Sequence, residues 1–223
     1  MILIIRTIHF IKQMSYFYSL DKEEKFNTIS HGIGAFLAII GMVVLLYYNT
    51  DKSPYATWGI VIYSISLISM LFVSTVYHAV DNRIWKLRMR ILDHINIYYL
   101  IAGTYTPVAL ITLINGNGWQ IFFTVWAIAT VGTILKLFFT GKYEIVSLLL
   151  YLLMGWLIVF DFQNLVDNTT DKGIQLLILG GAFYTIGIIF YAVRRIPCNH
   201  FIWHLFVLFG AISHWFFIYL DVI

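Results

Sequence analysis

Charged residues are scarce in this sequence. Only 11% of its 223 residues are Asp, Glu, Lys or Arg, whereas 61% are hydrophobic. Soluble domains are typically about 25% charged, and a soluble fold of this length cannot bury so much apolar surface. Intrinsic disorder is excluded on the same grounds. The composition therefore predicts an integral membrane protein.

Cysteine is nearly absent, since Cys198 is the only one. A secreted module built on disulfides is thereby excluded. The net charge of +3 is small, and the basic residues form no face suited to nucleic acid. Membrane lipids are the expected partners, and the sequence leaves the oligomeric state open.

Long apolar runs dominate the chain from residue 30 onward. Seven of them approach the roughly 20 residues that a helix needs to cross the hydrocarbon core. Runs of this length favour helices over the short alternating strands of a membrane barrel. We expect an all-α fold in which a segment 1–29 precedes one transmembrane domain, 30–221. The expected spans are 30–49, 57–78, 92–113, 118–139, 144–161, 173–193 and 200–221.

Basic residues in the short loops predict the orientation. Cytoplasmic loops of membrane proteins carry an excess of Lys and Arg, which here places the N-terminus in the cytoplasm and the C-terminus outside. The cytoplasmic loops then hold Arg83, Lys86, Arg88, Arg90, Lys142, Arg194 and Arg195, and the outer loops hold Lys52 and Lys172.

The first 19 residues mix apolar side chains with Arg6, His9 and Lys12 and lack the pattern of a signal peptide. Two interpretations stay open. The segment forms an amphipathic helix on the inner membrane surface, or Met14 is the true start of the protein.

Ionisable residues gather at one end of the expected spans. His31 opens the first span, His78 closes the second, Asp93 and His94 open the third, and His200 opens the seventh. The predicted topology puts all these ends on the cytoplasmic side. Ionisable residues within membrane segments are costly and usually functional, so residues far apart in sequence are expected to form one site.

Histidine spacing suggests a metal ion. His200 and His204 are four residues apart and share one helix face. Three neutral imidazoles and a water complete a zinc site with an open position, in which zinc lowers the pKa of the water to about 7. A carboxylate such as Asp93 would hold that water or accept its proton. Ligand type alone leaves iron and manganese as alternatives.

Four motifs occur in order along the chain. They are residues 24–31 (EKFNTISH), 74–78 (STVYH), 92–94 (LDH) with 102–107 (AGTYTP), and 200–204 (HFIWH) with 210–214 (GAISH). With these motifs the sequence resembles the hemolysin III family, the bacterial branch of the progestin and adipoQ receptor family.

The resemblance implies a zinc ion near the cytoplasmic face of a seven-helix protein in the bacterial inner membrane. Its ligands would be His78, His200 and His204, with Asp93 contacting the zinc-bound water and Ser74 supporting the site. Eukaryotic relatives are associated with ceramide hydrolysis, so the resemblance implies a lipid amide or ester as substrate and a role in membrane lipid homeostasis. The family name also implies cytolysis.

Simpler interpretations exist for the same residues. The histidines would bind water or lipid headgroups at the interface, Asp93 would cap its helix, and Ser74 would bond its own backbone. Asn27 and His31 would cap the first helix or support the metal ligands from behind. We expect His94, Cys198 and His214 to be no ligands, because His94 points away from Asp93 and His214 lies about 15 Å deeper than His204.

Two functions from different classes follow. The first is a zinc-dependent membrane hydrolase that a lipid enters sideways from the bilayer. The second is a non-enzymatic sensor or interaction protein stabilised by zinc, with a cytolysin as its more specific version. The middles of the spans are nearly all apolar, which disfavours a pore.

Overall fold

The structure is a computed structural model that describes residues 21–193 and 195–223. The expected surface helix or alternative start within the first 19 residues lies outside the described residues, and so does Arg194.

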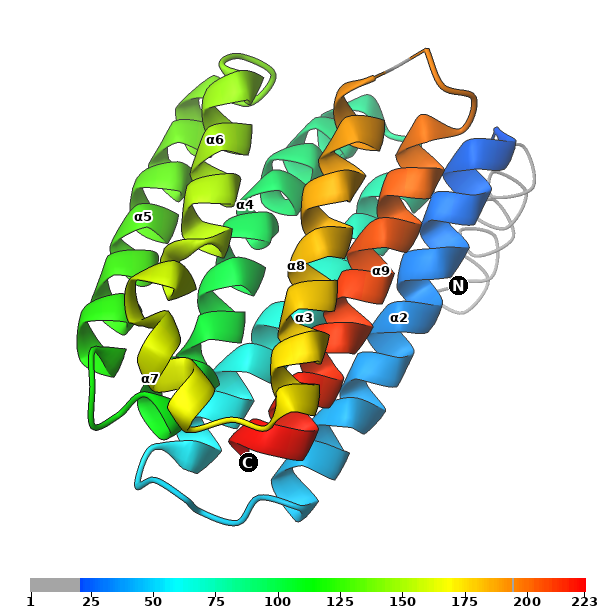
Figure 1. Cartoon of the computed structure of the whole chain (residues 1–223). Helices are drawn as coiled ribbons and strands as arrows, with labels where there is room; N and C mark the ends of the chain where they lie inside the picture. The colour runs from blue at the N-terminus through cyan, green and yellow to red at the C-terminus, as the bar shows by residue number, and fades with distance from the viewer. Residues whose placement is uncertain (1–20, 194) are drawn as a thin grey trace, which may run out of the picture.

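Among the described residues, seven helical segments are long and apolar enough to cross a membrane, which confirms the predicted all-α, multi-span fold. They stand side by side in one bundle (Figure 1). The helices are α2 (Lys22–Tyr47), α3 (Ala56–Ala79), α4 (Arg83–Pro107), α5 (Gly118–Phe139), α6 (Glu144–Gly155), α7 (Phe162–Asp167), α8 (Asp171–Ala192) and α9 (Asn199–Phe217). Shorter turns follow three of them: π-helical η1 (Val108–Thr112) after α4, 3-10 η2 (Leu157–Asp161) after α6, and π-helical η3 (Ile218–Val222) after α9.

Two helices begin earlier than hydropathy predicts. The side chain of Asp21 accepts from the backbone N–H of Lys22 at the start of α2, and Asn82 accepts from two N–H groups at the start of α4. Such caps satisfy the free amides of a helix start. The first turns are charged, so a hydropathy window misses them. His31 and Asp93 therefore lie inside their helices, and the expectation that they open them was wrong.

The fifth span is broken rather than continuous. α6 ends at Gly155, and the chain passes through η2 into α7. The hydroxyl of Tyr105 on α4 donates to the carbonyl of Gly155 (2.9 Å) and accepts from the N–H of Ile158 (2.9 Å). Because backbone groups within a membrane must find partners in the protein, this tyrosine supports the break, which the sequence analysis did not foresee.

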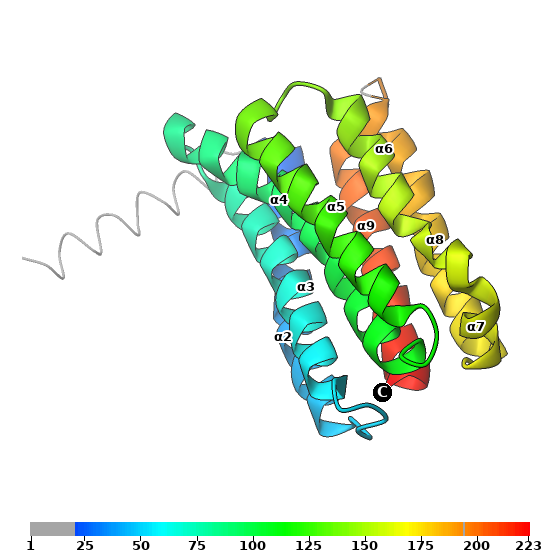
Figure 2. The same cartoon turned by 90° about the vertical axis from the view of Figure 1, so that its left-hand side faces the viewer.

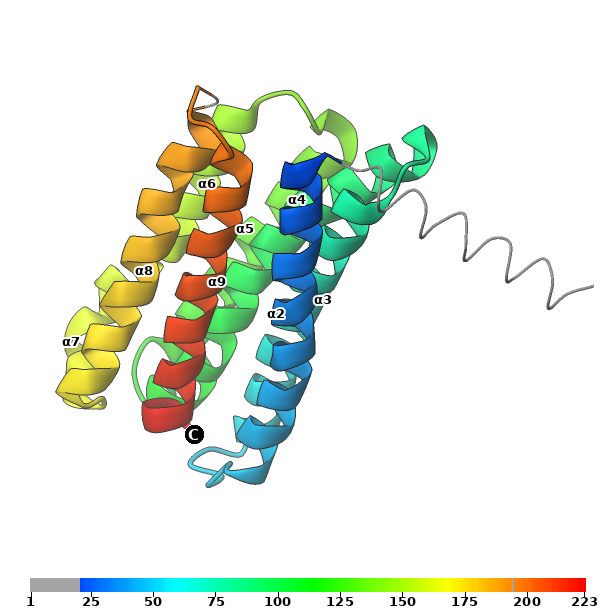
Figure 3. The same ribbon diagram turned by 90° about the vertical axis from the view of Figure 1, so that its right-hand side faces the viewer.

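Packing places α4 at the centre of the bundle. It is the most buried of the seven spans and packs on α3 and α5. α2 lies between α3 and α9, and α9 packs on α8 (Figures 2 and 3). In Figure 1, α2, α4 and α9 begin at the upper end of the bundle, and the C-terminus lies at the lower end. We call the upper end the histidine end.

Candidate metal centre

Three histidines from two helices meet at the histidine end. His78 comes from the last turn of α3, and His200 and His204 come from the first turns of α9. One potential ligand atom from each lies within 4.8 Å of the others. The ring centroids are 4.8–5.1 Å apart. Three imidazoles at this spacing can bind a metal ion, and zinc commonly uses such ligands.

Local structure explains why α9 supplies two of them. Cys198 adopts a left-handed backbone conformation (φ 53°) that turns the chain into α9. The side chain of Asn199 donates to the carbonyl of Phe190 (2.8 Å) and connects the start of α9 to α8. Helical spacing then puts His200 and His204 on one face.

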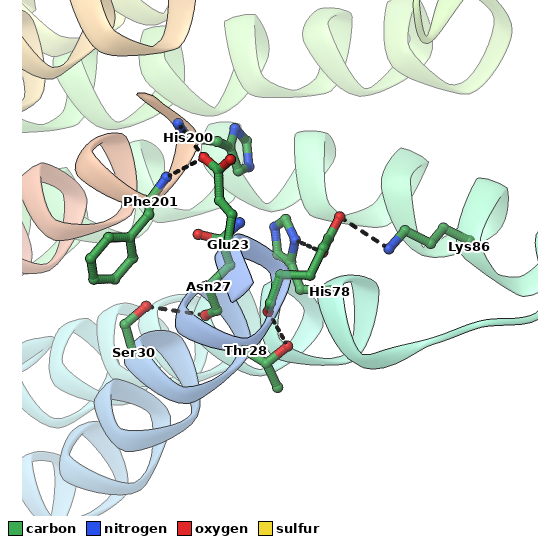
Figure 4. Close-up of polar contacts among 9 residues, drawn as sticks. Glu23, Asn27, Thr28, Ser30, His78, Lys86, His200 and Phe201 are labelled. Atoms are coloured by element: carbon green, nitrogen blue, oxygen red, sulfur yellow. Dashed lines mark hydrogen bonds and ion pairs between the residues drawn. The ribbon is translucent and has the colours of Figure 1, made fainter. Parts of the chain in front are cut away.

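Glu24 on α2 orients His78. Its Oε2 lies 2.6 Å from Nδ1 of His78, and its Oε1 lies 3.4 Å from the ammonium of Lys86 (Figure 4). A carboxylate at this distance favours the tautomer with a proton on Nδ1, which leaves Nε2 with a free lone pair. Nε2 of His78 is buried and has no hydrogen-bond partner among the described residues. An unpaired acceptor beside two further imidazoles fits a metal ion.

Glu23, the preceding residue, contacts α9. Its Oε1 accepts from the backbone N–H groups of His200 (3.0 Å) and Phe201 (3.3 Å) (Figure 4). These amides belong to the first turn of α9, where helical partners are lacking. The first turn of α2 therefore contacts both helices that carry the three histidines.

Asn27 and His31 lie one and two turns further along α2. The ring of His31 stacks on that of His204 at 3.8 Å between centroids and 17° between planes. Both residues are buried, and the side-chain oxygen of Asn27 and both ring nitrogens of His31 have no hydrogen-bond partner in the described part of the chain. The structure thus brings both residues to the histidine cluster, behind His204.

Asp93 and Ser74 approach from the central helices. Ser74 is buried on α3, one turn before His78, and its hydroxyl lies close to the partly buried Asp93 carboxylate on α4. Both residues line the same cavity as His200 and His204.

That cavity has a volume of about 700 Å³ and runs from the histidine end into the bundle. Polar groups line its upper part, including Asp93, His200 and His204. Further in, the lining is mostly apolar, with side chains such as Leu100 of α4, Leu152 of α6 and Ile178 of α8, and His214 is among its few polar groups. The shape suits a ligand with a polar group at one end and an apolar chain at the other.

Comparison with known protein families identifies the family of this chain. The family described as "Haemolysin-III related" matches residues 20–215, a range that contains every residue of the site. The chain belongs to this family. As a haemolysin-III member it is a multi-pass membrane protein.

Relatives in the haemolysin-III group cover most of the chain. "Hemolysin-3" of Bacillus cereus is 39% identical over 201 residues, which span 90% of this chain and 92% of the relative. "Hemolysin-3 homolog" of Bacillus subtilis is 39% identical over 198 residues, 87% of this chain and 92% of the relative. The human "Monocyte to macrophage differentiation factor" is 31% identical over 201 residues, with 87% and 82% covered. No solved structure matches.

Other candidate residues of this haemolysin-III chain lie outside the histidine cluster. Nδ1 of His94 lies 3.9 Å from Glu144 on α6. His214 shares a hydrogen bond of 3.2 Å with the carbonyl of Leu177 on α8. Cys198 is an exposed free thiol.

Sequence reasoning assigned no role to Glu23 or to Glu24, the first residue of the motif 24–31, because it placed both outside the first span. One signal was available: an Asp followed by two acidic residues in the next turn is typical of a helix start. It also missed Lys136, a 1% exposed lysine of α5 that pairs with Glu144 at 2.7 Å. The contacts of these residues could not be predicted from the spacing of residues along one helix, because each contact joins two separate helices.

Proposed function

We propose that this haemolysin-III protein is a zinc-dependent hydrolase of a lipid amide or ester, located in the bacterial inner membrane with its histidine end toward the cytoplasm. His78, His200 and His204 would hold the zinc ion. One observation carries the proposal: the buried, unpartnered Nε2 of His78 belongs to a three-histidine cluster at the polar end of a cavity that continues between apolar walls.

Each neighbouring residue has a distinct role in this proposal. Zinc, when bound, supplies Lewis acidity and activates water for attack at neutral pH. Asp93 accepts a proton at its carboxylate, and Ser74 orients that carboxylate through its hydroxyl. Glu24 keeps Nε2 of His78 available as a ligand. Asn27 and His31 support His204 from behind.

The cavity favours a membrane lipid as substrate. An acyl chain entering from the bilayer would lie against the apolar walls, which would bring its amide or ester carbonyl to the histidine end. An acyl chain that moves from the bilayer to these walls stays in an apolar medium, so the polar groups at the histidine end would supply most of the selectivity for the substrate. Hydrolysis of such a lipid would give the protein a role in membrane lipid homeostasis.

Metal content tests the first half of the proposal. Elemental mass spectrometry on protein purified without chelators should find close to one zinc per chain, and a His204→Ala variant should lose it. Trp203→Phe, a neighbouring change on α9 without loss of an imidazole, serves as the control and should retain zinc. A wild-type protein without zinc would refute the metal site.

Turnover tests the second half. Asp93→Asn should retain zinc and thermal stability but lose hydrolysis of the lipid amides and esters that the wild type cleaves. General acid–base groups typically contribute 10²–10⁴-fold to a rate, so a loss of at least about 100-fold is expected. A zinc-loaded wild type that cleaves no amide or ester in such a panel would exclude the hydrolase.

A non-enzymatic role is the second candidate. The three histidines come from α3 and α9, and the first turn of α2 contacts both helices, so a bound zinc would stabilise the packing of distant segments. In that case the protein would act as a membrane sensor or interaction protein, or as a cytolysin in line with the name of the Bacillus cereus relative. Asp93→Asn would then leave function intact, whereas His204→Ala would abolish function and stability together.

A further inference from the structure

A second polar cluster lies beside the cavity, which two of its members, His94 of α4 and Glu144 of α6, line. Lys136 is 1% exposed and lies 2.7 Å from Oε2 of Glu144. Oε1 of Glu144 accepts from the N–H of Gly141 (2.9 Å) and lies 3.9 Å from Nδ1 of His94. Glu144 thus has partners at both oxygens and is neutralised by Lys136, so it offers no free charge to a ligand.

Arg90 is the only lysine or arginine among the described residues that lines the cavity. It is partly buried and lines the cavity, one turn before Asp93 on α4. Within residues 21–193 and 195–223, Lys86 and Lys136 each have a carboxylate within 4.0 Å, but Arg90 has none. Its guanidinium lies beside Gly141, at the turn between α5 and α6.

Asp93 does not neutralise this guanidinium. The charge of Arg90 acts on the Asp93 carboxylate at longer range, and that carboxylate is already approached by the hydroxyl of Ser74. None of the described residues forms a hydrogen bond with the Arg90 guanidinium, which lines the polar end of the cavity, so its N–H donors are available to a ligand that enters there. Such an arginine is best satisfied by an anionic oxygen group that arrives with the ligand.

A phosphate is the group that suits this arrangement. Guanidinium binds phosphate through two parallel hydrogen bonds and is more weakly hydrated than an ammonium group. We propose that Arg90 forms a phosphate-binding subsite at the polar end of the cavity, so that the ligand is a lipid bearing a phosphate group. The inference rests on the proposed function only in taking the occupant of the cavity to be a lipid.

A simpler view treats Arg90 as one of several interfacial cations that attract headgroups of the surrounding bilayer. Arg88 provides the comparison. It lies on the same helix, is exposed, and stacks over Trp85 at 5.4 Å. Arg88 does not line the cavity, whereas Arg90 does. If attraction to bilayer headgroups were the cause, both Arg88 and Arg90 would contribute to the preference for a phosphate-bearing lipid. If the cavity holds a phosphate subsite, Arg90 alone would contribute.

Binding to metal-free protein tests the proposal. Wild type, Arg90→Gln and Arg88→Gln are treated with a chelator in neutral detergent, and binding is followed by intrinsic tryptophan fluorescence, because Trp156 and Trp203 line the cavity. The probes are oleoyl lysophosphatidic acid and monooleoylglycerol, which share an acyl chain and differ by the phosphate. A hydrogen bond to a charged group typically contributes enough free energy for a 10-fold change in affinity. Wild type and Arg88→Gln should therefore bind lysophosphatidic acid about 10-fold more tightly than monooleoylglycerol.

Arg90→Gln should bind both lipids with similar affinity and keep the wild-type affinity for monooleoylglycerol, which shows that the variant is folded. Equal binding of the two lipids by wild type would overturn the proposal, and so would an unchanged preference in Arg90→Gln. Inorganic phosphate at millimolar concentration should not displace the lipid; displacement would assign the subsite to free phosphate instead. Because neither zinc nor turnover enters this measurement, it can succeed or fail independently of the hydrolase.

Discussion

Glu24 and His78, which are 54 residues apart, form a short polar contact at the histidine end, with Oε2 and Nδ1 at 2.6 Å. Glu24 lies on α2, a helix that carries none of the three clustered histidines. Its neighbour Glu23 binds the amides at the start of α9. The geometry of the cluster thus depends on a helix that contributes none of its three candidate ligands.

Glu24→Gln is expected to weaken zinc binding. Glutamine retains an acceptor oxygen for Nδ1–H but removes the negative charge that makes the imidazole a stronger ligand. Loss of such a contact typically costs 10–100-fold in metal affinity, and competition with a chromogenic zinc chelator would measure it. Lys86→Met is the control, because it removes the other partner of Glu24 and leaves the contact with His78 in place. Wild-type affinity in Glu24→Gln would show that the carboxylate does not act on the ligand.

Replacement of the two partners in the Lys136–Glu144 pair should have unequal effects. Glu144→Gln leaves a lysine side chain that is 2% exposed without its counter-charge, whereas Lys136→Met leaves a glutamate side chain that is 28% exposed. Removing one partner of a buried pair costs roughly 3–5 kcal/mol, and water lowers that cost for the more exposed group. Thermal unfolding in detergent should therefore show a larger loss of stability for Glu144→Gln. Equal losses would contradict this view of the pair.

Tyr105→Phe should destabilise the break in the fifth span. The change removes one hydroxyl that serves both the carbonyl of Gly155 and the amide of Ile158. Leaving buried backbone groups unpaired costs about 1–3 kcal/mol, so the amide of Ile158 should exchange its hydrogen faster. Tyr99→Phe, on the same helix and without a hydrogen bond of its hydroxyl to the described residues, should leave exchange unchanged. Unaltered exchange in Tyr105→Phe would mean that the break is supported in another way.

The single cysteine offers a test of orientation. Cys198 is exposed at the histidine end, which we propose faces the cytoplasm. A membrane-impermeant maleimide should label it in inside-out vesicles and not in intact cells. In a Cys198→Ser background, Asn115→Cys places a thiol in the exposed turn at the opposite end and should give the reverse pattern. Labelling of Cys198 in intact cells would invert the topology.

Much of this architecture was predictable because the hydrocarbon core of a membrane permits few backbone conformations. Backbone groups within a membrane must be satisfied by helices or closed barrels, so the length of the apolar runs was enough to predict seven spans. Four spans, an even number, separate the end of the second span from the start of the seventh, which placed His78, His200 and His204 at one end. Helix starts were less predictable, since the charged turns before His31 and Asp93 carry no hydropathy signal.

Contacts between helices could not be predicted in the same way. The pairing of Lys136 with Glu144 and the position of Tyr105 at the helix break depend on how each helix is rotated about its axis. Rotation is set by side-chain packing between neighbouring helices, for which one sequence carries little information. The same holds for Arg90, whose place in the cavity distinguishes it from Arg88.

The sequence by itself determined the class of protein, the number of spans and the depth at which its histidines lie, because hydropathy and helical periodicity follow directly from residue order. Only the tertiary structure decided that Glu24 contacts His78, that Arg90 faces the cavity without a carboxylate partner, and that the fifth span breaks at Gly155. Those features depend on which faces of separate helices meet, and packing in three dimensions selects them.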